Sequence, residues 1–122
     1  MRTVVITGGT SGIGLETAKY LTKENYNIAV IGRKESKIQY AVEIIGNKSR
    51  GYHCDVSTIN EIEITLKRIF DDFGSIDVLV NNAGILDTST IDSLSEEEWN
   101  QVININLKGT FFMIQKAIPY LA

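Results

Sequence analysis

The feature that most constrains this 122-residue chain is a glycine-rich segment near its N-terminus, TGGTSGIG at residues 7–14. A run of apolar β-forming residues precedes the segment, and an amphipathic helical pattern follows it at once. Glycines in such a place permit a tight turn, close packing of helix on strand, and close approach of the backbone to a phosphate. The start of the helix adds free N–H groups and the positive end of its dipole. The segment therefore predicts a phosphate-binding turn, and the alternative is an ordinary turn.

The spacing of three of these glycines narrows the choice of turn. Gly8, Gly12 and Gly14 form a Gly-x-x-x-Gly-x-Gly pattern, which differs from the Gly-x-Gly-x-x-Gly of many dinucleotide-binding turns. No Lys-Ser or Lys-Thr pair follows the last glycine, and this excludes the P-loop of nucleoside triphosphatases.

Strand and helix patterns alternate along the whole chain. We expect strands at 2–7, 27–31, 50–53 and 76–80, and helices at 12–24, 35–45, 58–73 and 96–118. Alternation of this kind predicts a parallel sheet, and right-handed crossovers give the strand order 3-2-1-4. The expected fold class is α/β, a Rossmann-like doubly wound sheet that ends after the fourth strand and a long helix. Residues 1–122 form one domain in this prediction, with a crevice at the carboxyl ends of strands one and four.

Two helix starts carry capping-box patterns, and the last helix has an unusual surface. The patterns are Thr58-x-x-Glu61 and Ser95-x-x-Glu98. The helix at 96–118 is apolar around most of its circumference before it stops near Pro119. A helix of this kind is expected to be buried on more than one side.

Composition excludes several classes of function. Twelve Lys and Arg against fifteen Asp and Glu give a net charge of −3, which opposes a nucleic-acid partner. Cys54 is the only cysteine, so no disulfide forms within the chain and a reducing, cytoplasmic setting fits. No apolar run is long enough for a membrane span, and no His, Cys or carboxylate cluster has metal-ligand spacing.

Four further sites fit the glycine turn, and the first three have a simpler alternative. Arg33 follows the second strand and suits a ribose 2′-phosphate, or it is a solvated surface cation. Asp55 follows the third strand and could face an adenine amino group, or it caps the next helix. Residues 82–84, Asn-Ala-Gly, end the fourth strand and admit a ribose, or they stabilise the sheet edge. Asn106 lies among apolar residues of the long helix.

Together, in this order and at this spacing, the motifs resemble those of the NAD(P)-dependent short-chain dehydrogenase/reductase family, in its N-terminal half. The resemblance covers all 122 residues and rests on the turn at 7–14, on Asp55-Val56, on Asn81 to Gly84, and on Trp99 followed by Asn106-Leu107-Lys108-Gly109. It implies that the pyrophosphate is cradled by Gly8, Thr10, Ser11, Gly12, Ile13 and Gly14. It further implies that Asp55 and Val56 flank the adenine and that Asn82, Ala83 and Gly84 lie at the adenosine ribose and the nearby sheet.

The resemblance also implies a catalytic role and a cofactor preference. Asn106 matches the asparagine of the family's catalytic tetrad, which anchors a water in a proton relay, although a structural role is equally open for this chain. Arg33 stands where NADP-preferring members carry a basic residue, so NADP is the expected cofactor. Ser11 stands where many of those members carry a second basic side chain.

One departure from the family pattern bears directly on catalysis. The family relies on a serine and a Tyr-x-x-x-Lys pair, whose lysine lowers the tyrosine pKa for proton exchange with the substrate. None of the five tyrosines has a lysine four residues on. We therefore expect a cofactor-binding half that is inactive alone. The alternative is a stand-alone nucleotide-binding or oligomerisation module, and we expect a homo-oligomer formed through the 96–118 helix or strand four.

Overall fold

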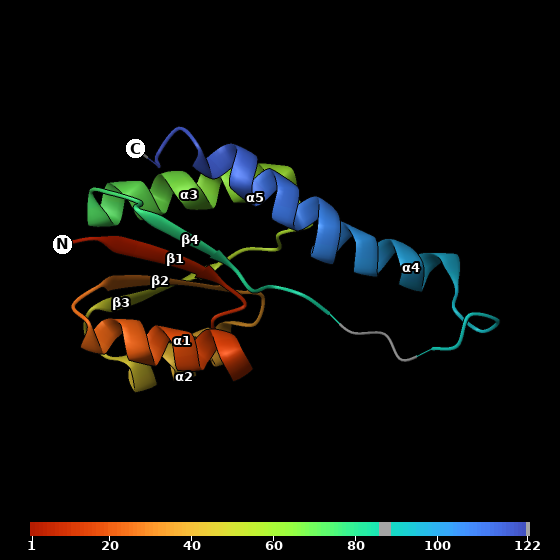
Figure 1. Ribbon diagram of the computed structural model, residues 1–122, viewed down its shortest axis with the longest axis horizontal. Coiled ribbons are helices and arrows are strands. Elements are labelled where there is room, and N and C mark those ends of the chain that lie inside the picture. The colour runs from red at the N-terminus through yellow and green to blue at the C-terminus, as the bar shows by residue number, and fades with distance from the viewer. Residues whose placement is uncertain (86–88, 122) are drawn as a thin grey trace.

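The computed structural model describes residues 1–85 and 89–121. Strands and helices alternate as the sequence predicts (Figure 1). The elements are β1 (Thr3–Thr7), α1 (Gly12–Lys23), β2 (Asn27–Gly32), α2 (Glu35–Ile45), β3 (Ser49–His53), α3 (Ile59–Phe73), β4 (Val78–Asn81), α4 (Glu96–Ile103), η1 (Asn104–Gly109) and α5 (Thr110–Ala117). None of the helices in these two ranges is long and apolar enough to cross a bilayer.

The four strands form one parallel sheet in the order β3-β2-β1-β4, which confirms the predicted topology. Every residue of β1 is buried, because the strand pairs on both sides and is covered on both faces. Val4 and Ile6 face the layer of α1 and α2, whereas Val5 faces the layer of α3 and α5. Figure 1 shows these two helical layers on opposite sides of the sheet. The carboxyl ends of β1, β2 and β4 therefore meet at one edge.

The fourth strand begins later than the predicted range of 76–80. Ile76 is buried among residues of the α3 and α5 layer, and regular pairing with β1 starts at Val78. Asp77 meets β1 partly through its side chain, because Oδ2 of Asp77 accepts a hydrogen bond from the Thr3 amide at 2.8 Å. The pairing continues to Asn81, one residue beyond the predicted end.

The predicted helix at 96–118 is continuous but not uniformly α-helical. A six-residue π-helical segment, η1, separates α4 from α5. Sequence periodicity does not reveal this insertion, since the apolar residues surround the helix. The N-cap half of the capping box predicted at its start is confirmed, because Ser95 Oγ accepts from the Glu98 amide at 3.0 Å. The Glu98 carboxylate accepts at Oε1 from the Ser95 hydroxyl, at 2.9 Å.

The predicted capping box at Thr58 and Glu61 is wrong. Thr58 is the residue before α3, but its side chain makes no capping hydrogen bond. Glu61 instead accepts a hydrogen bond at Oε1 from the Asp55 amide, at 3.3 Å. The carboxylate is drawn to this amide because the chain turns tightly between β3 and α3.

In the single chain, the 96–118 helix is buried along one side only, and the expected cover of its other side stays a prediction. One stripe at four-residue spacing packs on the sheet and α3: Ile105, Gly109, Met113 and Ala117. The opposite side carries exposed large apolar residues: Trp99, Leu107, Phe111, Ile114 and Ile118. Figure 1 shows α4 extending beyond the end of the sheet, which explains why none of its residues is buried.

Candidate functional site

A cavity of about 310 Å³ lies at the carboxyl ends of β1, β2 and β4. Its volume falls within the range of about 300–1,000 Å³ that is common for ligand pockets. Seven of the residues predicted from the sequence line it: Gly8, Thr10, Ser11, Arg33, Val56, Ala83 and Gly84. The chain thus brings four separate segments to one cavity, at the position where open α/β sheets bind their ligands.

The glycine turn is held in shape from two sides. Gly8 has a left-handed φ of +65°, and its amide donates to the Ile31 carbonyl of β2 at 3.0 Å. The Gly8 carbonyl accepts from Nδ2 of Asn82 at 3.1 Å. A Cβ placed on Gly14 would lie 2.3 Å from this same carbonyl oxygen. The first turn of α1 therefore packs directly on the loop, and only glycine at position 14 allows that approach.

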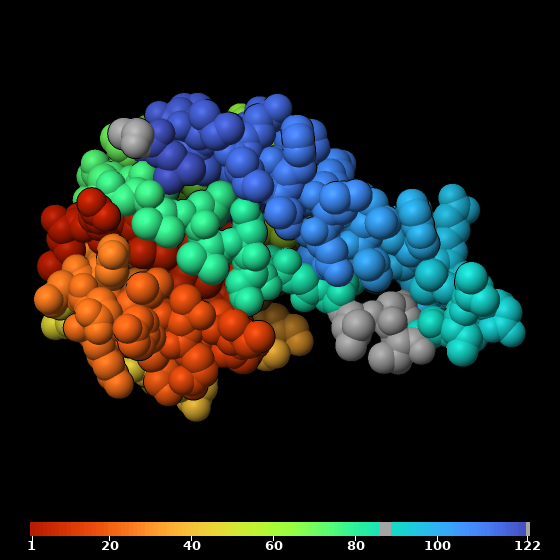
Figure 2. Space-filling view, viewed as in Figure 1, coloured from red at the N-terminus to blue at the C-terminus, as the bar shows by residue number. Residues whose placement is uncertain are grey.

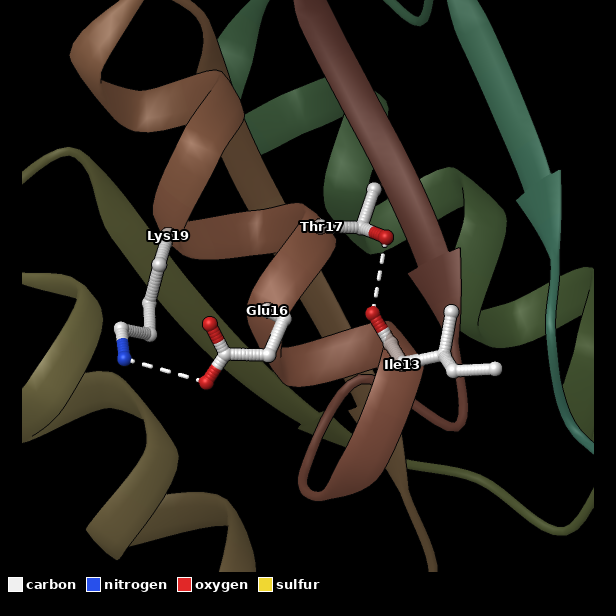
Figure 3. Close-up of polar contacts among 4 residues, drawn as sticks. All are labelled: Ile13, Glu16, Thr17 and Lys19. Atoms are coloured by element: carbon white, nitrogen blue, oxygen red, sulfur yellow. Dashed lines mark hydrogen bonds and ion pairs between the residues drawn. The ribbon is translucent and has the colours of Figure 1, made fainter.

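The first turn of α1 retains its free donors and its positive potential. Ser11 precedes the helix without capping it through its side chain, and the first turn carries no acidic residue. Glu16, which follows the first turn, pairs with Lys19 and not with the free amides, with an Nζ–Oε1 distance of 3.1 Å (Figure 3). Thr17 donates to the Ile13 carbonyl at 2.7 Å in the same helix. Unpaired amides at a helix N-terminus favour an anion, so this end of α1 fits a pyrophosphate.

The ends of β1 and β4 are joined by a buried threonine. Thr7 Oγ1 accepts hydrogen bonds from the amides of Asn82 and Ala83, at 3.0 and 2.9 Å. Because Asn82 also holds Gly8, the motif after β4 supports the glycine turn directly. The structure thus shows that residues 82–84 stabilise the sheet, which is the alternative role expected from the sequence. Their predicted contact with a ribose stays a prediction.

Asp55 lies beside the main cavity and lines an adjoining one with Arg33 and Ser57. Its Oδ1 accepts from the amide and the hydroxyl of Ser57, at 2.9 and 2.7 Å. Partial burial raises the pKa of Asp55, but the Ser57 hydrogen bonds and the positive charge of Arg33 outweigh this and leave the pKa below its usual value. Asp55 is therefore an ionised acceptor at neutral pH.

Val56 lines the main cavity and rests against the π-helical segment. A Cβ on Gly109 would lie 2.9 Å from both the Val56 carbonyl oxygen and its Cγ2 atom. Gly109 thus permits the close approach that places Val56 at the cavity wall. In this way the Asn106-to-Gly109 motif shapes the cavity without lining it itself.

Asn106 is exposed, and its side chain binds the segment that follows β4. Oδ1 of Asn106 accepts from the Ile85 amide and Nδ2 donates to the Ile85 carbonyl, both at 2.8 Å. Ile85 lines the cavity next to Gly84. The side chain therefore positions the cavity rim, whereas the predicted role in a proton relay stays a prediction.

Not every predicted residue reaches the main cavity. Gly12 and Ile13 line a shallow hollow on the outer face of α1, and Gly14 and Asn82 lie beneath the turn. The site also contains residues that sequence reasoning missed: Lys34, Lys37, Cys54, Ile85 and Ile105. The two lysines follow Arg33 closely, and this short run of cations is the signal that could have drawn attention to them.

Comparison with known proteins is consistent with this geometry. The family model described as short chain dehydrogenase matches residues 2–122. The chain belongs to the short-chain dehydrogenase family. This confirms the predicted resemblance, and the parallel 3-2-1-4 sheet confirms the predicted fold class.

Individual members of the short-chain dehydrogenase family are similar over nearly the whole chain. A 3-oxoacyl-(acyl-carrier-protein) reductase of Staphylococcus aureus is 41% identical over 125 residues, covering 98% of this chain and 50% of that protein. A variant of actinorhodin polyketide ketoreductase, solved with NADPH, is 34% identical with a TM-score of 0.92, covering 96% of this chain and 46% of that one. A 3-ketoacyl-(acyl-carrier-protein) reductase of Brucella melitensis, complexed with NADH, is 27% identical with a TM-score of 0.93, covering 98% and 49%. The chain spans about half the length of the curated relatives it matches.

Proposed function

We propose that this chain binds NADP(H) in the cavity at the ends of β1, β2 and β4, and that it serves an oxidoreductase that interconverts a carbonyl and an alcohol. The observation that carries the proposal is the glycine turn, which is locked against α1 and opens into the cavity. Family members solved with NADPH and with NADH support a dinucleotide in this place. Arg33 in the lining favours NADP, because a guanidinium suits a 2′-phosphate.

The residues fit the dinucleotide in several ways. The turn and the uncapped start of α1 offer backbone amides to the pyrophosphate, with Gly8, Thr10 and Ser11 at the cavity wall. Asp55 is an ionised acceptor for the adenine amino group, and Val56 offers an apolar surface to the ring. When bound, the nicotinamide supplies the hydride; this chain's residues hold the adenosine and pyrophosphate and exclude water from them.

We further propose that these 122 residues bind the cofactor without catalysing hydride transfer. No tyrosine among them has a lysine four residues on, so the acid–base pair expected for the family is not contained in them. Groups of this kind contribute about 10²–10⁴-fold to rate. Asn106 remains the one proposed member of the catalytic tetrad.

Binding and turnover can be measured separately. Calorimetric titration with NADPH and NADH is expected to show binding of both, with NADPH the tighter ligand. Absorbance of NADPH in the presence of ketones and aldehydes is expected to stay constant. Turnover by the pure chain would overturn the inactive-half proposal, and the absence of heat with either dinucleotide would overturn the cofactor proposal.

A second candidate function is association with another copy of the chain. Trp99, Leu107, Phe111, Ile114 and Ile118 are exposed on α4 to α5. Strand β4 pairs only with β1 in the described sheet, and Figure 2 shows atoms of the β4 region at the surface between α1 and α5. Burying a side chain of this size stabilises by about 1.5–3 kcal/mol, so we propose a homo-oligomer through this helix or through β4.

Light scattering tests this association. The parent chain is expected to be larger than a monomer at micromolar concentration, and Phe111→Lys is expected to shift it toward the monomer. Tyr40→Lys, which replaces an exposed aromatic residue on α2, is the matched control and is expected to leave the size unchanged. A monomeric parent would contradict the proposal.

A reducing, cytoplasmic setting is also proposed, since the only cysteine, Cys54, is buried and unpaired.

A further inference from the structure

We propose that Lys37 is a second cationic residue that, with Arg33, selects a ribose 2′-phosphate in the cavity. The inference rests on the proposed binding of NADP(H) and adds a specificity-determining residue to it. Arg33 leaves β2, whereas Lys37 lies in the first turn of α2, so the two cations approach the cavity from different elements. Ser11, which also lines the cavity, is uncharged.

The charge balance of the cavity lining supports this assignment. Arg33, Lys34 and Lys37 line it, and no Asp or Glu is among the described lining residues. Cofactors without the 2′-phosphate are commonly recognised by a carboxylate that accepts from the ribose hydroxyls. A phosphate monoester carries about −1.5 to −2 charges at neutral pH, so two nearby cations match it better than one.

The orientation of α2 directs Lys37 toward the cavity. Ile38 is 3% exposed and packs beneath the sheet edge, where a Cβ on Gly32 would lie 3.1 Å from its Cγ1 atom. This contact fixes the rotation of the helix. Side chains in a helix lean toward its N-terminus, so the side chain of Lys37 extends back along α2 toward Arg33.

The same rotation separates Lys37 from the nearest acid on the helix. At about 100° per residue, Lys34 and Lys37 lie about 60° apart around α2, and Glu35 lies about 160° from Lys37. Glu35 accordingly lines a different hollow, on the side of α2 that faces Gly51. Lys37 thus approaches the cavity without a carboxylate beside it on its own helix.

The two cations also differ in their surroundings. Arg33 lies close enough to Asp55 to lower the pKa of that carboxyl group, and both line the adjoining cavity. Among the ion pairs of residues 1–85 and 89–121, none involves Lys37. Lys37 therefore faces the cavity without an ion-pair partner among these residues, whereas part of the field of Arg33 is balanced by Asp55.

The test uses adenosine phosphates, which lack the nicotinamide. Affinities for adenosine 2′,5′-bisphosphate, its 3′,5′ isomer and 5′-AMP are measured by calorimetry on the 122-residue chain. The parent is expected to prefer the 2′,5′ isomer over the other two. Lys37→Gln is expected to lower affinity for the 2′,5′ isomer about five-fold and to leave 5′-AMP unchanged. The loss is expected to shrink as salt is raised, because exposed charges are screened.

A matched variant and the remaining outcomes complete the test. Lys23→Gln removes the same charge from the last turn of α1, away from the cavity, and is expected to leave all three affinities unchanged. If the parent prefers the 2′,5′ isomer and Lys37→Gln keeps that preference, the role of Lys37 is overturned and the proposed function stands. Equal binding of the 2′,5′ isomer and 5′-AMP by the parent overturns the 2′-phosphate site alone. If none of the three ligands binds, the proposed cofactor site fails as well.

Discussion

The side-chain amide of Asn106 forms two hydrogen bonds with the backbone of Ile85, each 2.8 Å long. The pair joins the π-helical segment to the chain that leaves β4, and Gly84 lies alongside, where a Cβ would be 3.3 Å from the Asn106 Oδ1 atom. π-Helical segments within α-helices are frequent at functional sites. Here the segment carries an asparagine whose side chain pairs with both backbone polar groups of Ile85.

The two hydrogen bonds of Asn106 can be removed separately by substitution, because one uses its side chain as an acceptor and the other as a donor. Asn106→Asp keeps an acceptor for the Ile85 amide but loses the donor to the Ile85 carbonyl, and Asn106→Ala loses both. We expect Asn106→Ala to lower the free energy of unfolding by about 1 kcal/mol. Faster hydrogen exchange at the Ile85 amide is expected in Asn106→Ala but not in Asn106→Asp. Equal exchange in all three proteins would contradict the pairing.

Because α1 contacts the glycine turn at Gly14, we expect alanine at this position to destabilise the fold, although alanine usually stabilises a helix. Alanine usually stabilises a helix relative to glycine by about 1 kcal/mol. At Gly14, however, the new Cβ would meet the Gly8 carbonyl oxygen at 2.3 Å and Asn82 Nδ2 at 2.5 Å. We expect Gly14→Ala to destabilise the fold by about 1–3 kcal/mol, because added atoms force backbone shifts, and to abolish nucleotide binding. Urea denaturation and calorimetry measure the two effects.

Gly12 provides the control for this substitution. Its φ of +54° is left-handed, but a Cβ there would meet no atom within 4 Å. Gly12→Ala therefore carries only the conformational cost of about 1–2 kcal/mol. Binding that survives Gly14→Ala unchanged would show that the α1 contact does not shape the site.

The link between Asp77 and Thr3 predicts a dependence of stability on pH. The hydrogen bond from the Thr3 amide, followed by that from the Ser75 hydroxyl, lowers the pKa of Asp77 below its usual value. A carboxyl group with a lowered pKa stabilises the fold above its unfolded pKa of about 3.9, and this contribution is lost as the pH falls through the folded value. The parent is therefore expected to be more stable than Asp77→Asn at about pH 7, with the difference shrinking as the pH falls below the unfolded value toward the lower folded one.

Urea denaturation across this pH range measures the difference. Asp71→Asn is the matched control, since Asp71 pairs with Lys67 on the exposed side of α3, with an Nζ–Oδ2 distance of 2.9 Å. Exposed pairs of this kind contribute little to stability. A pH-independent difference between the parent and Asp77→Asn would contradict the role given to the carboxylate.

The strand order and the location of the site were predictable from local patterns. Alternating elements require parallel pairing with crossovers, and a glycine turn after the first strand places the cavity at the switch in strand order. Arg33 and Val56 follow the ends of β2 and β3, so topology alone brings them to the same edge. None of this required knowledge of side-chain contacts.

The remaining features depend on contacts between distant residues. Asn82 holds Gly8 across 74 positions of the sequence, and Gly109 makes room for the Val56 backbone. The capping box predicted at Thr58 failed for the same reason, because Glu61 found the Asp55 amide. A one-dimensional pattern gives the residue types at these positions, but only the packed structure selects their partners.

The position of Cys54 leads to a last prediction, on chemical labelling. Cys54 is 1% exposed and lines the cavity wall beyond Gly32. Burial, more than the charges of Glu61 and Asp55, raises the pKa of its thiol to about 11, although the hydrogen bond with Thr65 opposes this.

Since only the thiolate is alkylated, we expect iodoacetamide at about pH 8 to label the folded chain at least about a hundred-fold more slowly than the chain in urea, where the thiol pKa is about 8.5. Because the thiol borders the proposed site, NADPH is expected to slow labelling further while leaving the rate in urea unchanged. Mass spectrometry of the single cysteine measures both rates, and rapid labelling of the folded chain would contradict the burial of this wall.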